Sequence, residues 1–137
     1  MSQIIVLSTG VIDNRAAVPG GARPVQSLVI RVENNQAVLQ SAEGLPVVAI
    51  EVFFERQIGG GFGVQATYAV NQISLADVNQ PMSTFTLDHV FADLDAFGVR
   101  CTVTSSGQLI TSIPTVTVTG KSADGTIVRT YAVLPVT

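Results

Sequence analysis

The residues best suited to chemistry gather in one stretch, 88–95, which holds the only histidine, His89, and the aspartates Asp88, Asp93 and Asp95. An acid beside a histidine is compatible with a general acid–base pair, and two nearby aspartates are compatible with a calcium site. Neighbours on a strand point to opposite faces, however, so Asp88 and His89 are not expected to converge on one substrate. Two carboxylates also fall short of the roughly six to eight oxygens that calcium takes. We therefore interpret the stretch as a turn capped by aspartate side chains.

Neither the single cysteine nor the glycine-rich segment predicts a catalytic site. Cys101 is in phase with Val99 and Val103 on an apolar face, which favours a buried structural thiol. An intermolecular disulfide stays open if that phase is wrong. Residues 59–63 (GGGFG) lack the Lys-Ser/Thr pair of a phosphate-binding loop, so we interpret them as a hairpin turn. We predict no catalytic, metal or cofactor site, and hence a protein that is not an enzyme.

The composition excludes several classes of function. The chain has 137 residues, enough for one domain, and only 12% of them are charged against 47% hydrophobic, which argues against disorder. Its seven lysines and arginines are scattered and the net charge is −3, so a nucleic-acid surface is not expected. No apolar run approaches the ~20 residues of a membrane span, and residues 1–9 lack the features of a secretory signal.

Apolar and polar residues alternate with a period of two through most of the chain, as in half-buried antiparallel strands. We predict an all-β protein, an antiparallel β-sandwich or jelly roll of about seven or eight strands. The predicted strands are 25–33, 37–41, 47–56, 63–75, 82–88, 96–104, 113–121 and 126–134. Asp124-Gly125 predicts a tight hairpin turn with positive φ at both central positions. Only 73–78 and 89–97 could form a helical turn.

Residues 1–24 differ from the rest and are predicted to be an N-terminal arm or connector to a single domain at 25–137. Residues 2–7 could form a short strand, and 11–24 are rich in turn residues. In one interpretation the arm is an edge strand that folds back on its own domain. In the other it pairs with a neighbouring copy through main-chain hydrogen bonds. The candidate subunit-interface residues are Ile4, Ile5, Val6, Leu7, Val11 and Ile12.

Several short motifs resemble small proteins that are common in spore-forming Firmicutes. Their opening is matched by residues 8–15 (STGVIDNR) and 23–32 (RPVQSLVIRV). Their later half is matched by 90–97 (VFADLDAF), 104–106 (TSS) and 118–128 (VTGKSADGTIV). These proteins are similar in plan to the subunits of endospore appendages, the fibres called Ena, in which a connector precedes a jelly-roll domain.

The resemblance implies a self-assembling structural subunit of a pilus-like fibre, with strand addition between subunits and the connector docked into a neighbour. It implies a homopolymer outside the cell or on the spore surface, assembled in the mother cell without a signal peptide. Appendage subunits typically carry several cysteines, some of them in the connector, whereas residues 1–24 here contain none. That departure puts disulfide cross-links between subunits in doubt.

Two further observations bear on function. Phe53 is out of phase with Val52 and Phe54, so an apolar group is expected on the solvent face of a sheet, and the low charge favours association. The alternative hypothesis is a non-catalytic binding module, such as a carbohydrate-recognising jelly roll or a phage structural domain. Its candidate aromatic platform residues are Phe53, Phe62, Tyr68 and Tyr131.

Overall fold

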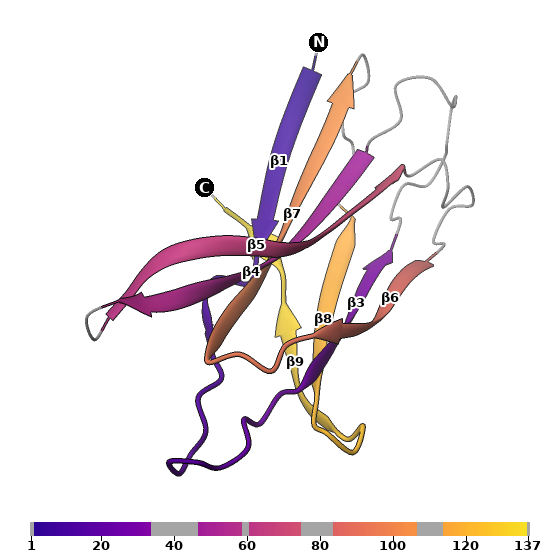
Figure 1. Ribbon diagram of the computed structural model, residues 1–137. Helices are drawn as coiled ribbons and strands as arrows, with labels where there is room; N and C mark the ends of the chain where they lie inside the picture. Colours follow the sequence, from indigo (N-terminus) through magenta and orange to yellow (C-terminus); the bar gives the residue numbers. More distant parts are fainter. Residues whose placement is uncertain (1, 34–46, 59–60, 75–83, 107–113, 137) are drawn as a thin grey trace.

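The fold is an all-β sandwich of two antiparallel sheets (Figure 1). The computed structural model describes residues 2–33, 47–58, 61–74, 84–106 and 114–136. Sheet A has the order β10-β1-β7-β4-β5, with β2 also paired to β7, and sheet B has the order β6-β3-β8-β9. The strands are β1 (Ser2–Ser8), β2 (Ile12–Asp13), β3 (Ser27–Glu33), β4 (Val47–Ile58), β5 (Gly61–Ser74), β6 (Thr84–Phe91), β7 (Ala96–Ser106), β8 (Thr115–Lys121), β9 (Ile127–Ala132) and β10 (Leu134–Pro135). The predicted fold class is therefore confirmed.

Individual strands agree with the predicted ones except near the chain ends and the turns. The strand predicted at 126–134 is two strands, because the buried Val133 crosses from β9 in sheet B to β10 in sheet A. The helical turn considered at 89–97 is absent: β6 continues to Phe91, and β7 begins at Ala96. The strand predicted at 37–41, and most of the possible turn at 73–78, lie outside the described residues.

The core lies between the sheets and is built from the alternate residues of each strand. In β3 the buried residues are Leu28, Ile30 and Val32, and the outward ones between them are less buried. The other large contributions come from the inward residues of β4 (Val48, Ile50, Val52) and of β7 (Phe97, Val99, Cys101, Val103). Burial raises the pKa of the Cys101 thiol to about 12, so this group is neutral near pH 7. The inward, structural placement predicted for Cys101 is confirmed.

The hairpin between β8 and β9 is confirmed, but its turn differs from the expected one. Gly125 N–H donates to the Ser122 carbonyl at 3.0 Å, and Ser122 N–H donates to the Thr126 carbonyl at 2.9 Å. Gly125 has φ of 87°, whereas Asp124 has a negative φ. The Asp124 carboxylate accepts from the Ser122 hydroxyl and from Thr126 N–H, and these bonds lower its pKa to about 2. The loop is thus a four-residue turn, 122–125, whose last residue is a left-handed glycine.

Phe53 does lie on the outer face of sheet A, but it is not exposed to water. Its ring rests on the backbone of Gly98, and the Arg100 guanidinium lies over it at 5.4 Å. A Cβ atom on Gly98 would stand 2.3 Å from the Phe53 ring and 2.5 Å from the Gly10 carbonyl oxygen. Gly98 is therefore required here by the close approach of two other parts of the chain.

Gly98→Ala is expected to lower the free energy of unfolding by about 1–3 kcal/mol, since an extra methyl group in a closely packed site forces its neighbours apart. Chemical denaturation followed by circular dichroism measures the change. Gly21→Ala is the comparison variant: a Cβ atom there would lie 3.1 Å from Val18, a tight contact that a small shift relieves, so a smaller loss is expected. An unfolding midpoint for Gly98→Ala equal to that of Gly21→Ala would contradict this packing.

Candidate assembly interface

β1 and β2 together place half of the predicted interface residues against the core of their own domain. Its residues pair with β7 from Ser2↔Ser106 to Ser8↔Arg100, and β10 lies on its other side (Figure 1). Leu7 is 1% exposed, and Ile5 packs half-buried against the same core. Ile12, in β2, also packs against it. These side chains stabilise the fold and are not available to a partner while β1 stays in place.

The other half of the predicted set points elsewhere. Ile4 is 65% exposed and Val11 is exposed as well, while Val6 is half-buried. Because Ile4 and Val6 alternate with Ile5 and Leu7, they lie on the outer face of sheet A. Ile4, Val6 and Val11 are thus the members of the set that a neighbouring molecule could contact. The assignment to a subunit interface, and the boundary at residue 24, stay predictions.

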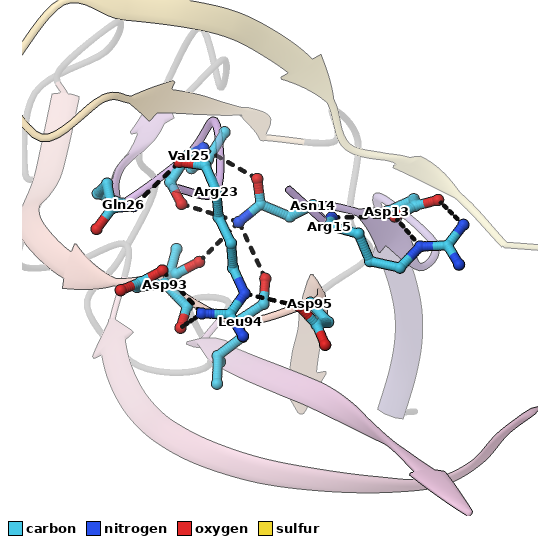
Figure 2. Close-up of polar contacts among 10 residues, drawn as sticks. Asp13, Asn14, Arg15, Arg23, Val25, Gln26, Asp93, Leu94 and Asp95 are labelled. Carbon is cyan, nitrogen blue, oxygen red and sulfur yellow. Dashed lines mark hydrogen bonds and ion pairs between the residues drawn. The ribbon is translucent and has the colours of Figure 1, made fainter. Parts of the chain in front are cut away.

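The connector after β2 is held by the side chain of Asn14, which is 2% exposed (Figure 2). Its amide nitrogen donates to the carbonyls of Val25, Ala92 and Leu94, at 2.8, 3.1 and 3.0 Å. Its amide oxygen accepts from Val25 N–H at 2.9 Å. One side chain therefore closes the loop between residues 14 and 25 and ties it to the segment between β6 and β7.

Arg23 completes this network and accounts for two of the aspartates that the sequence singled out. Its Nε donates to Asp95 at 2.7 Å, and its Nη1 donates to the Asp93 carboxylate at 3.1 Å (Figure 2). The bond to Asp95, and then that to Asp93, raises the pKa of Arg23. Both carboxylates thus bind the connector, whereas the role predicted for them was to cap their own turn. Neither Asn14 nor Arg23 was predicted, because their partners lie about 70 to 80 residues away in the sequence.

Asp88 and His89 form a β-bulge in β6. The register with β3 passes from Leu28↔Val90 to Ile30↔Leu87, so the pair stands opposite Val29 alone. His89 has φ of 56°, in the left-handed region, and both side chains are exposed. Across the described segments, no group of three or more His, Cys, Asp or Glu side chains is placed to hold a metal ion.

The three candidate aromatic residues whose side chains are described do not form an exposed platform. Phe53 is buried under Arg100, and Tyr68 and Tyr131 are half-buried against the core. Tyr68 instead links the sheets: its hydroxyl donates to the Phe91 carbonyl, and its ring meets that of Phe91 edge-on at 6.5 Å. Burial raises the pKa of Tyr68 to about 12. The side chain of Phe62 lies outside the described part.

The edges of the two sheets differ in charge. Sheet A ends in β5, which has no charged residue or proline over its 14 residues, and on the other side in β1 with the short β10. β1 is also uncharged. Sheet B ends in β6, which carries Asp88 in its bulge, and in β9, which carries Arg129. Charged side chains are one device that protects a sheet edge from pairing with another chain, so by charge sheet A has the less protected edges.

β5 pairs regularly with β4 over residues 69–74. Its register with β4 is unbroken from Val47↔Ser74 to Val52↔Ala69, and the irregularities fall at Tyr68 and at Gly63. Within this regular stretch, 69–74, Val70 is 67% exposed. An added strand would meet an uninterrupted ladder there.

No protein-family model matches the chain, and a search of curated proteins also gave no match. Among the described residues there is no helix of the length and hydrophobicity needed to cross a membrane.

Proposed function

We propose that this protein is a structural subunit that assembles with copies of itself into a fibre, by strand addition between the edges of sheet A. The observation that carries the proposal is the absence of charge from both of these edges, in β1 and β5. An uncharged edge with unpaired N–H and C=O groups is a template for another strand, and β5 has no proline either.

The strand directions favour a head-to-tail contact. β1, β7, β4 and β5 alternate in direction, so β5 runs antiparallel to β1. If a second copy in the same orientation brings its β5 beside β1, the antiparallel alternation continues from one molecule into the next. A contact between two different surfaces repeats without closing, unless the rotation between copies makes a ring. Such a contact supports an open fibre.

The outer face of sheet A is also suited to contact with a neighbour. Its central charges, Glu51 and Arg100, bind each other at 3.0 Å and leave no net charge. Around them lie small or apolar side chains such as Ala49, Val6 and Val70. In the proposed fibre Ile4, Val6 and Val11 are the arm residues that contact the neighbour. The exposure of Ile4 and Val11 supports that role.

The proposed fibre is a pilus-like appendage, outside the cell or on a spore. The resemblance of residues 8–15 and 90–97 to small proteins of spore-forming Firmicutes supports this setting. Cys101, the only cysteine of the chain, is buried, so packing and main-chain hydrogen bonds hold the copies together.

Val70→Lys is expected to abolish assembly while leaving the domain folded, because it places a charge on the regular stretch of the β5 edge. Wild-type protein should sediment as large species and show fibres by negative-stain microscopy. Val70→Lys should sediment at the 14.3 kDa of the monomer.

The matched control is Val18→Lys, which makes the same change at a site that is 65% exposed in the connector, away from any sheet edge. It should assemble like the wild type. The proposal fails if Val70→Lys also assembles like the wild type, or if the wild-type protein remains monomeric at high concentration.

A further inference from the structure

β10 covers only part of the β1 edge. The register pairs Leu7 with Pro135 and Ser8 with Leu134, and Val136 N–H donates to the Val6 carbonyl at 2.9 Å. The rest of β1, from Ser2 to Ile5, pairs with β7 but has no partner among the described residues on its outer side. The edge is thus half covered by the chain's own C-terminal segment.

The backbone groups of β1 that face away from β7 are divided evenly between the covered part and the open part of the edge. In an antiparallel ladder, alternate residues direct their N–H and C=O groups to the same side. The backbone N–H and C=O of Val6 point to β10, so those of Ser2, Ile4 and Ser8 point to that side as well. The backbone groups of the odd-numbered residues point to β7. Val6 and Ser8 are covered by β10, and Ser2 and Ile4 are left open.

β10 is held weakly compared with the residue before it. Val133 is buried between the sheets, but Leu134 and Val136 are 63% and 58% exposed. Little apolar surface therefore holds β10 down, and its attachment rests on the few main-chain bonds to β1. The segment can leave the edge while Val133 keeps its place in the core.

β10 also resembles the strand that the proposed fibre would add. It is antiparallel to β1, as an incoming β5 would be, and it occupies the same edge. Pro135 stands opposite Leu7, at a position that directs its backbone nitrogen away from β1, where a proline has no N–H to offer a further strand. β10 therefore blocks strand addition in two ways, by occupying β1 and by presenting a poor edge of its own.

We propose that β10 is a self-capping strand: it competes with β5 of a second copy for the β1 edge and so slows assembly until it is displaced. This inference rests on the proposed function. It gives the β1 edge a regulatory element that the β5 edge lacks, since in the described sheet nothing pairs with the outer side of β5.

The test uses a pair of variants at one position. Val136→Pro removes the N–H that binds the Val6 carbonyl. Val136→Ala keeps this N–H, and both variants replace the same exposed valine side chain. We expect Val136→Pro to assemble about fivefold faster than Val136→Ala, the factor that corresponds to one hydrogen bond of about 1 kcal/mol at 25 °C. A chain truncated after Val133 should assemble at least as fast as Val136→Pro. Light scattering follows the rates.

Amide hydrogen exchange in the unassembled wild-type protein tests the capping role of β10 independently of fibre formation. The Val136 amide is expected to exchange much faster than the Leu7 amide, which points to β7. Equal protection of the two amides, or equal assembly rates of the Val136 variants, overturns the cap. If neither the wild-type nor the truncated chain assembles, the proposed function is wrong, and the capping proposal, which depends on it, is wrong as well. Fast exchange at Val136 then reports only a loose chain end.

Discussion

Leu7→Ala is expected to lower the free energy of unfolding by about 2–5 kcal/mol, the cost of deleting a large side chain from a closed core. Leu7 lies in β1 yet is fully buried, so the N-terminal strand contributes to the core like any strand of the sandwich. Ile4→Ala, in the same strand, is expected to cost less than about 0.5 kcal/mol because Ile4 is exposed. Urea denaturation of the two variants measures both values. Equal losses would contradict the inward placement of Leu7.

This placement changes how the arm is to be tested. Deletion of residues 1–24 removes β1, β2 and the Asn14 network together, and it uncovers one side of β7. The deleted chain is expected to unfold, so its failure to assemble would say nothing about an interface. Exposed single positions such as Val70 are the informative sites, because they can be changed without disturbing the core.

Asn14→Ala is expected to lower the free energy of unfolding by about 2–4 kcal/mol, although Asn14 lies in a connector. The change removes the side chain that bonds both the N–H and the carbonyl of Val25, and each unsatisfied buried group costs about 1–3 kcal/mol, whereas the Ala92 carbonyl still accepts from Leu94 N–H. Water that enters the gap would offset part of this cost. Thermal or urea denaturation measures the loss.

The control is Asn71→Ala, at an exposed asparagine in β5, which should be nearly neutral. Asn14→Asp adds a second readout. Its carboxylate would face several carbonyl oxygens at neutral pH, whereas the protonated acid could donate to one of them. The Asp variant should therefore be less damaging at pH 3 than at pH 7. Similar losses for Ala at positions 14 and 71 would contradict the role of this network.

The period-two pattern was sufficient to predict the sandwich and most of its inward residues. That pattern is local, and the faces it predicts for β3 and β7 are the ones the structure buries. The Asn14 and Arg23 contacts could not be predicted in this way, because they depend on the 92–95 segment returning to the connector. The bulge at His89 was missed because it is set by the register with β3.

The candidate interface illustrates the same limit. The sequence shows that only 12% of residues are charged, but it does not show which strands lie at an edge. The topology supplies that information: uncharged β1 and β5 lie toward the two ends of sheet A, and the edge strands of sheet B carry Asp88 and Arg129. The difference in charge between the edge strands of the two sheets can be recognised only when the strand order is known.

Hydrogen–deuterium exchange, compared between unassembled and assembled protein, tests strand addition at the edges of sheet A most directly. The account predicts new protection of backbone amides in β5, centred on 69–74, and in β1 at Ser2 and Ile4, with β6 and β9 unchanged. New protection in β6 or β9, with none in β5, would contradict it.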